Sequence, residues 1–138
     1  MNIVIDNNIL FSIMKPSSIN SYIFSAINAK FFAPEFILEE LNEHREECLL
    51  KSGLSAQEFE MRLNEIEENI KFLGSPLYED FLEKVSDLIE DADDIDFLAL
   101  ALYTHSAIWS NDSHFREQGD IDVFTTLDLL NMFLRREV

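Results

Sequence analysis

Short apolar runs alternate with amphipathic helical stretches along this chain, and that alternation restricts the fold more than any other feature. The strand candidates lie at residues 3–5, 30–34, 107–110 and 121–126, and residues 71–76 indicate a brief strand followed by a turn. Between them apolar residues recur three and four positions apart, which is typical of helices that bury one face. Residues 34–51 follow this spacing as one long helix. Short strands that alternate with helices predict an α/β protein whose parallel sheet is covered by helices on both faces.

The length of 138 residues fits one domain, residues 1–138, that is large enough to bury a core. No apolar run approaches the roughly 20 residues that cross a bilayer, and the first ten residues lack the basic start of a signal peptide. With Cys48 as the one cysteine no internal disulfide can form, so we expect a cytoplasmic protein. Three glycines leave no glycine-rich phosphate loop, which makes the usual nucleotide cofactors of βαβ units improbable.

The charge balance is strongly acidic, with 27 acidic and 10 basic residues and a formal net charge of −17. A surface of this kind repels nucleic-acid phosphates and anionic membranes. Any polyanionic substrate must therefore be met by cations bound to the protein, by a local basic patch or by a partner. Most of the acidic residues are expected to solvate exposed helix faces.

Four acidic residues are expected near one edge of the sheet. In open parallel α/β sheets, ligands bind outside the carboxyl ends of the strands. Asp6 directly follows the first strand, and Asp112 follows the strand at residues 107–110. Asp94 begins the helix that leads into that strand, and Glu40 lies about one turn into the helix after the second strand. These four carboxylates form the candidate site.

Helical angle separates the candidates from their acidic neighbours. In "EDADDIDFLALAL", residues 90–102, Asp94 shares a face with apolar positions three, four and seven residues further on. Asp96 is turned about 200° away from Asp94 at 3.6 residues per turn. Glu40 lies on the apolar face of its helix, whereas Glu39 is rotated by about 100°. We therefore favour Asp94 over Asp96 and Glu40 over Glu39, the second choice resting on weaker evidence.

Several carboxylates held together favour a cation between them. Two unit charges about 4 Å apart repel by about 4 kcal/mol at an effective dielectric of 20. Hard divalent ions take oxygen ligands, and the set lacks His or Cys at ligand spacing, so it indicates Mg²⁺ or Mn²⁺ rather than zinc. Two such ions could activate a water and stabilise the leaving oxygen of a phosphodiester.

Each acid taken alone has a commonplace explanation. An Asp at a helix start is often an N-cap worth about 1 kcal/mol, which would account for Asp93 or Asp94. An Asp beside an Asn at a strand end often makes an Asx turn. For any one residue this explanation is the favoured one. The joint placement of the four at one edge of the sheet is what favours a metal site.

Three motifs resemble the PIN-domain ribonucleases, a family that includes the VapC-type toxins of toxin–antitoxin systems. "VIDNNIL" is similar to the opening hydrophobic-Asp-x-Asn motif, with Asn7 where a hydroxyl residue is common. "FAPEFILEELNEH" resembles the strand and Glu-bearing helix that follow. "DADDIDFLALALYTHSAIWSNDSHF" is similar to the acidic helix and the Ser-x-Asp strand end, and the resemblance extends over nearly the whole chain.

The resemblance implies a three-layer α/β/α Rossmann-like fold and endonucleolytic cleavage of RNA with Mg²⁺ or Mn²⁺. It also implies a possible antitoxin partner and a homodimer. Asp6, Glu40, Asp94 and Asp112 would be the metal-binding set, with Asn8 and Ser110 as supporting polar residues. Asp91 and Asp93 would either support the ligands or be solvated.

Two functions are carried forward. The first is a metal-dependent endoribonuclease acting on single-stranded RNA, as the toxin of a pair. The alternative is a catalytically idle PIN-like protein whose acidic surface binds a basic protein partner. Arg45 and Arg116 could either hold RNA near the site or form exposed salt bridges. Four other side chains are expected to be structural or at the surface: Trp109, His44, His105 and His114.

Overall fold

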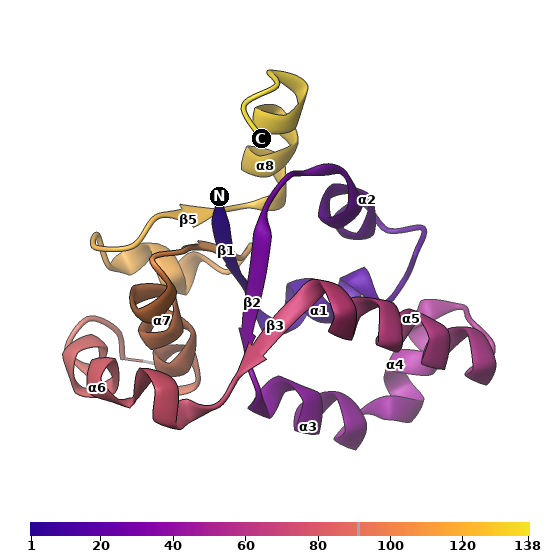
Figure 1. Cartoon of the computed structure of the whole chain (residues 1–138), viewed down its shortest axis with the longest axis horizontal. Coiled ribbons are helices and arrows are strands. Elements are labelled where there is room, and N and C mark those ends of the chain that lie inside the picture. Colours follow the sequence, from indigo (N-terminus) through magenta and orange to yellow (C-terminus); the bar gives the residue numbers. More distant parts are fainter. Residues whose placement is uncertain (91) are drawn as a thin grey trace.

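The computed structural model of the chain describes residues 1–90 and 92–138, apart from the side chain of residue 93. In this part of the chain five strands form one parallel sheet in the order β3-β2-β1-β4-β5 (Figure 1). The strands are β1 (Asn2–Ile5), β2 (Lys30–Pro34), β3 (Ile70–Leu73), β4 (Ala107–Trp109) and β5 (Val123–Phe124). The expected α/β fold with a parallel sheet is confirmed.

Helices cover both faces of the sheet. The connections from β1 to β2 and from β2 to β3 cross the sheet in one direction, and the connection from β3 to β4 returns in the other. Right-handed crossovers therefore place the two sets of helices on opposite faces, as Figure 1 shows. One set is α1 (Asn7–Ile13), α2 (Ile19–Ala26), α3 (Phe36–Glu43), α4 (Arg45–Ser52) and α5 (Ala56–Asn69). The other is α6 (Ser75–Ser86), α7 (Ala92–Thr104) and the short 3₁₀ helix η1 (Ser113–Glu117). The last helix, α8 (Thr126–Leu134), packs on α2.

The centre of the sheet is the pair β1 and β4. Ile5 of β1 pairs with Trp109 of β4, and both side chains are fully buried. The strand order reverses between these two strands, because β2 and β3 lie beyond β1 while β5 lies beyond β4. Such a reversal opens a crevice at the carboxyl ends of the two strands. The residues that follow β1 and β4 therefore meet in that crevice.

Helix α7 forms the wall behind one face of the sheet. Its residues Leu98 to Ala101 are fully buried, and the helix contacts β1, β2 and β4. The Phe97 ring packs edge-on against Phe36 and Phe115, with ring centroids 5.9 and 6.1 Å apart. Since α7 leads into β4, it runs antiparallel to the strands, and its first turn lies at their carboxyl ends. This packing brings Asp94 to the same edge of the sheet as Asp6.

The single helix expected at residues 34–51 is wrong. Pro34 is the last residue of β2, and two helices, α3 and α4, meet at His44, whose backbone (φ −105°, ψ 23°) leaves the helical region. The His44 N–H still donates to the Glu40 carbonyl and its carbonyl accepts from Cys48 N–H, so the break leaves few backbone groups unsatisfied. Neither Gly nor Pro marks the break, which is why the sequence pattern runs through it.

None of the helices in the described residues is long and apolar enough to cross a membrane.

Candidate metal centre

The carboxylate of Asp6 joins the ends of β1 and β4. Asp6 caps α1 by accepting a hydrogen bond from Ile9 N–H at 2.8 Å, and its other oxygen accepts from the Ser110 hydroxyl. The Asp6 N–H donates to the Trp109 carbonyl at 3.3 Å. Asp6 is 5% exposed and Ser110 is fully buried, so the aspartate is held in one orientation by packing and by three hydrogen bonds.

Asp112 lies on the turn that follows β4. Its N–H donates to the Ser110 hydroxyl oxygen at 3.0 Å, so Ser110 contacts both aspartates. Its Oδ1 accepts from His114 N–H at 3.0 Å and lies 3.3 Å from His114 Nδ1. The Asp112 side chain therefore caps η1 while staying half exposed in the crevice.

Burial raises the pKa of the Asp6 carboxyl above its ordinary value. The hydrogen bonds from Ser110 and Ile9 lower the pKa in part, whereas the negative charge of Asp112 raises it further. Asp6 and Asp112 therefore repel each other across the crevice. A cation between them would relieve both the burial cost and the repulsion.

Glu40 reaches the site through Asn7, the residue directly after Asp6. The Asn7 side-chain amide donates to Glu40 Oε2 at 2.8 Å. Glu40 is half buried, and Glu39 is exposed and faces a different pocket, beside Glu35 and Tyr78. Glu40 and Glu39 therefore lie on different sides of α3.

Asp94 and Asp96 diverge as the helical angle predicts. Asp94 is 8% exposed on the face of α7 that carries buried Phe97, Leu98 and Ala101. Asp96 accepts a hydrogen bond from the Tyr78 hydroxyl of α6 at 2.9 Å. Burial, together with the Asp96 carboxylate, raises the pKa of Tyr78 well above its ordinary value. Asp96 therefore has a structural role in packing α6 on α7.

A chain of polar side chains fixes the wall of the crevice. The Thr126 hydroxyl of α8 donates to Asn20 Oδ1 at 2.6 Å and accepts from Trp109 Nε1 at 3.2 Å and from Asn111 Nδ2 at 3.0 Å. Asn20 in turn donates to Ser12 Oγ at 2.6 Å. This network connects α1, α2, α8 and the end of β4. A pocket of about 270 Å³ opens beside it, lined by Asp6, Asn8, Ile9, Asn20, Asn111 and Asp112.

The donor chemistry at this edge suits a hard divalent ion. Asp6 and Asp112 offer carboxylate oxygens in the pocket that Asn8 also lines with an amide, whereas Asp94 and Glu40 are not among its lining residues. In the described residues the carboxamide oxygen of Asn7 is buried without a hydrogen-bond partner. Such an oxygen could accept a hydrogen bond or bind a cation beside Glu40. Among the same residues, however, no three His, Cys, Asp or Glu side chains are arranged to ligate one ion. The structure brings Asp6 and Asp112 together and ties Glu40 to the site through Asn7.

The sequence also draws attention to residues other than the four carboxylates. Asp91 lies outside the described residues. The two arginines make exposed ion pairs, Arg45 with Glu60 and Arg116 with Asp128. Trp109 is core, as expected. Sequence reasoning missed Asn20 and Thr126; the signal for Asn20 is a polar side chain one turn before buried Phe24 on the inward face of α2.

Comparisons with known proteins agree with the fold. The family model described as a PIN domain matches residues 4–130. Among solved structures, the crystal structure of VapBC2 from Rickettsia felis bound to a DNA fragment from their promoter is similar, with a TM-score of 0.63 and 13% sequence identity. The match covers 91% of this chain and 98% of that chain. At this identity the likeness shows the fold alone. No curated protein matches the sequence.

The raised pKa of Asp6 predicts a pH-dependent effect of Asp6→Asn. An acid whose pKa is higher in the fold than its ordinary value of 3.8 contributes stability at low pH, and this contribution is lost as pH rises through the folded pKa. The free energy of unfolding of Asp6→Asn, relative to wild type, should therefore increase from pH 3 to pH 7, measured by urea denaturation at about six pH values across this range.

Asp128 supplies the control of opposite sign. The Thr125 N–H lowers the pKa of Asp128, so its charged form stabilises the fold at neutral pH and that stability is lost in acid. Asp128→Asn should become relatively less stable as pH rises. A relative stability of Asp6→Asn that stays constant or falls with pH contradicts the prediction.

The polar network predicts that Thr126→Val is more damaging than Thr126→Ser. Valine fills the same space but leaves the buried groups of Asn20 and Trp109, and the exposed amide of Asn111, without their shared partner. The expected loss is about 1–3 kcal/mol in the free energy of unfolding, whereas serine keeps the hydroxyl and should lose less. Equal losses in the two variants, measured by urea denaturation, would show that the hydroxyl is not what matters.

Proposed function

Because the chain belongs to the PIN-domain family, we propose that it is a metal-dependent endoribonuclease that hydrolyses phosphodiester bonds of single-stranded RNA. The observation that carries the proposal is the meeting of Asp6 and Asp112 at the switch point of the sheet, with Ser110 bonded to both. A fold kept only for packing has little need for two mutually repelling aspartates in a crevice.

The proposed ligand set is Asp6, Glu40, Asp94 and Asp112, with Mg²⁺ or Mn²⁺ as the ion. A divalent ion held there would activate the attacking water and offset the charge of the phosphate and the leaving oxygen. Ser110 would hold Asp6 and Asp112 at a fixed separation, and Asn7 would orient Glu40. Because carboxylates repel one another, Asp94 and Glu40 would complete the set by closing on the ion rather than by standing preformed.

The proposed substrate follows from charge as well as from the family. The site has carboxylates but few cations, so its resting surface repels a phosphate chain. A divalent ion would reverse the sign of the potential at the crevice and make binding of RNA local to the site. The crevice is open to solvent beside Asn8 and Asn111, which would admit an unpaired strand.

The biological setting is proposed from the neighbouring structure. That structure is a VapBC2 assembly on a promoter DNA fragment, which supports a toxin role for this chain with an antitoxin as partner in the cytoplasm.

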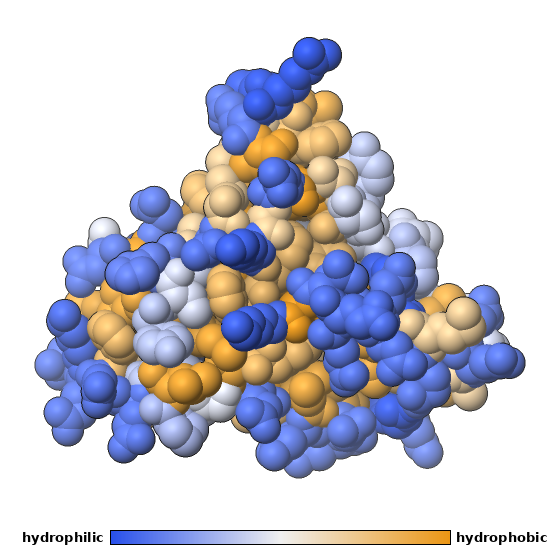
Figure 2. Space-filling view, in the orientation of Figure 1, coloured by the Kyte–Doolittle hydropathy of each residue, from blue (hydrophilic) through white to orange (hydrophobic). Residues whose placement is uncertain are grey.

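Apolar side chains gather around α8, as Figure 2 shows, and Ile19, Tyr22, Leu127 and Leu134 are exposed there and on neighbouring α2. This surface is available for an antitoxin or for the expected homodimer, and light scattering of the purified chain distinguishes a monomer from a dimer.

The alternative is a catalytically idle PIN-like protein that binds a basic protein partner through its acidic surface. The exposed acids of α5 and α6 would serve such a contact. This function would require neither a metal nor Asp6, and the two proposals therefore differ in one assay.

The nuclease proposal predicts that RNA cleavage requires a divalent metal and the carboxylates of the proposed ligands, and that it does not require the neighbouring acidic residues. Wild-type protein should cut labelled single-stranded RNA with Mn²⁺ or Mg²⁺ and not with EDTA. Asp6→Asn and Asp94→Asn should lower kcat/KM by on the order of 100-fold or more, because each removes a charged ligand of the ion. The measurement is the rate of product formation on denaturing gels.

Asp96→Asn and Glu39→Gln are the matched controls, since each removes the same type of charge from the same helix as a proposed ligand. Both should retain activity near that of wild type. Equal cleavage by wild type and the Asp6 and Asp94 variants would indicate a contaminating nuclease and overturn the proposal. No cleavage by wild type with either metal would favour the idle module.

A further inference from the structure

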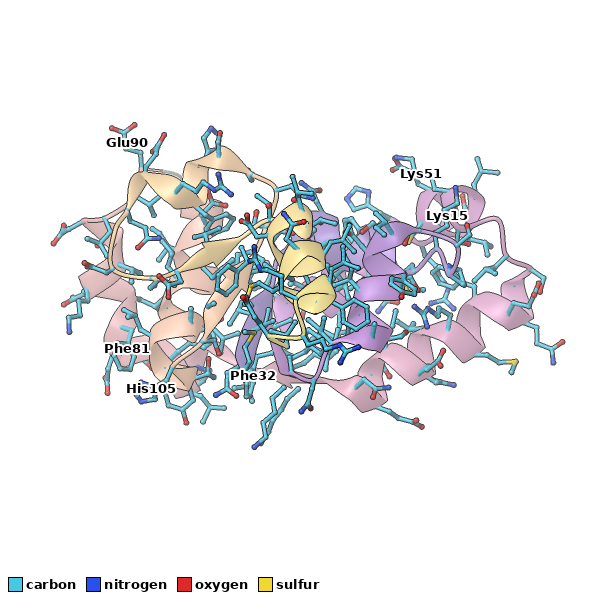
Figure 3. The ribbon with its side chains drawn as sticks, turned by 90° about the horizontal axis from the view of Figure 1, so that it is seen from above. Lys15, Phe32, Lys51, Phe81, Glu90 and His105 are labelled. Carbon is cyan, nitrogen blue, oxygen red and sulfur yellow. The ribbon has the colours of Figure 1, made fainter. Side chains whose placement is uncertain are left out.

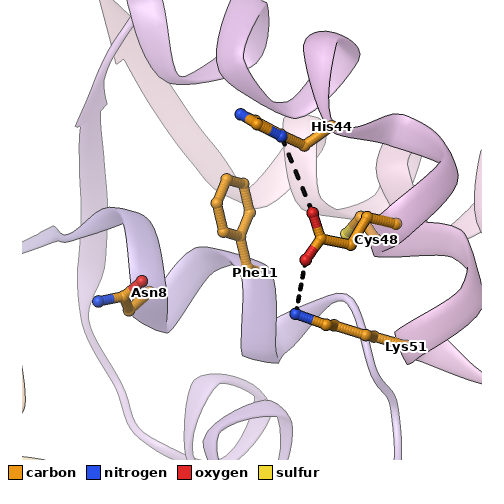
Figure 4. Close-up of a pocket in the computed structure, with 6 residues that line it drawn as sticks. Asn8, Phe11, His44, Cys48 and Lys51 are labelled. Carbon is orange, nitrogen blue, oxygen red and sulfur yellow. Dashed lines mark hydrogen bonds and ion pairs between the residues drawn. The ribbon is translucent and has the colours of Figure 1, made fainter.

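A second pocket adjoins the candidate metal centre. It lies between α1 and α4, has a volume of about 310 Å³ and is lined by Asn8, Phe11, His44, Glu47, Cys48 and Lys51 (Figure 4). We refer to it as the α1–α4 groove. Asn8 lines both this groove and the pocket that holds Asp6 and Asp112. A chain bound at the metal centre would therefore continue into the groove at Asn8.

The groove contains a lysine and a histidine in a strongly acidic protein. Lys51 and His44 lie on its α4 side, and a single carboxylate, that of Glu47, contacts both. Lys51 Nζ is 2.8 Å from Glu47 Oε1, and His44 Nδ1 is 3.9 Å from Glu47 Oε2. Figure 4 shows this carboxylate between the two side chains. The Glu47 carboxylate thus accepts a hydrogen bond from Lys51 and lies near His44, at a position where a phosphate oxygen could bind.

The contacts of Glu47 are easily exchanged. The side chains of Lys51 and Glu47 are 75% and 59% exposed, and exposed pairs four residues apart on a helix are weak. A phosphodiester group of RNA carries one full negative charge, as a carboxylate does, and can compete with Glu47 for the Lys51 ammonium group. Arg45 and Arg116, by contrast, are held by acids on other elements, Glu60 and Asp128.

The opposite wall of the groove is aromatic. The half-buried Phe11 ring lies between Asn8 and the His44–Glu47 pair, as Figure 4 shows. Unpaired bases stack on such rings, and single-strand binding combines stacking platforms with cations along the backbone. Figure 3 places Lys15, which follows α1, on the same flank of the molecule as Lys51, with Glu90 on the opposite flank.

We propose that the α1–α4 groove binds the nucleotide next to the scissile bond of a single-stranded RNA, with its base on Phe11 and its phosphate on Lys51 and His44. The proposal rests on the nuclease function proposed above. Glu47 acts in it as an internal competitor that holds the two donors until the phosphate displaces it. A protein segment bound in the groove would not have to displace Glu47, because the Glu47 carboxylate already neutralises the charge of Lys51.

The test uses Asp6→Asn as the parent, so that RNA is bound but not cut, and a short fluorescein-labelled single-stranded RNA of mixed sequence. Binding is measured by fluorescence anisotropy at several salt concentrations. Lys51→Gln should weaken binding and reduce the slope of log affinity against log salt by about 0.7, the value for one lost phosphate contact on a single strand. The affinity advantage of the parent over Lys51→Gln should therefore shrink by about 2.6-fold for a fourfold rise in salt.

Glu47→Gln should act in the opposite direction and tighten binding at least about twofold, because it frees both donors. Phe11→Leu should weaken binding about fivefold or more through lost stacking, with an unchanged thermal midpoint as the check on its fold. The matched controls are Lys71→Gln and Glu68→Gln, which make the same charge changes in a pocket beside the start of β3. Both controls should shift affinity less than their partners in the groove.

The proposal is overturned if Lys51→Gln and Glu47→Gln bind RNA with the same affinities as their controls. It is also overturned if the two variants change the affinity in the same direction. Unchanged RNA binding in all groove variants, Phe11→Leu included, likewise overturns the proposal. Cleavage of RNA by wild-type protein in the same preparation separates these outcomes from failure of the nuclease function. Wild-type protein that does not cut RNA overturns both proposals.

Discussion

The hydrogen bonds of Ser110 to Asp6 and Asp112 are the contacts on which the rest of the site depends. They exist because β1 and β4 pair in a register that places Ile5 beside Trp109. That register in turn depends on fully buried side chains on both strands, packed under α7. A shift of one residue would turn these side chains to the other face of the sheet, so the apolar core and the site are specified by the same pairing. The sheet order then makes this junction the switch point, where a crevice must open.

Negative charge at the junction is expensive, and the structure offsets only part of the cost. Ser110 and Ile9 donate to Asp6, yet its pKa stays above the ordinary value because burial, together with the negative charge of Asp112, outweighs these hydrogen bonds. Most of the other acidic residues face solvent and cost little, apart from buried Asp94 and half-buried Glu40. Asp6 and Asp112 therefore differ from the other acids in being held together by neighbours that do not neutralise them. That difference, rather than the total of −17, is what points to a cation.

Much of this arrangement could be predicted from the sequence, because it follows from periodicity. The strands were placed by short apolar runs, and the directions of Asp94 against Asp96 and of Glu40 against Glu39 followed from 3.6 residues per turn. Contacts between distant segments could not be predicted in this way. No local sequence pattern predicts the hydrogen bond from Thr126 to Asn20 or the separation of α3 and α4 at His44, because tertiary packing determines both. Asn7 was noted only as a departure from the family pattern, although it is the residue that links Glu40 to the site.

The central claim is that the carboxyl ends of β1 and β4 form a divalent-metal site. The most direct measurement is anomalous diffraction from crystals of the wild-type chain grown with Mn²⁺. The account predicts a manganese peak within about 2–2.5 Å of carboxylate oxygens of both Asp6 and Asp112. A crystal saturated with Mn²⁺ that shows no peak in this crevice, or one whose peak lies beside Glu35 and Asp96 instead, would contradict it.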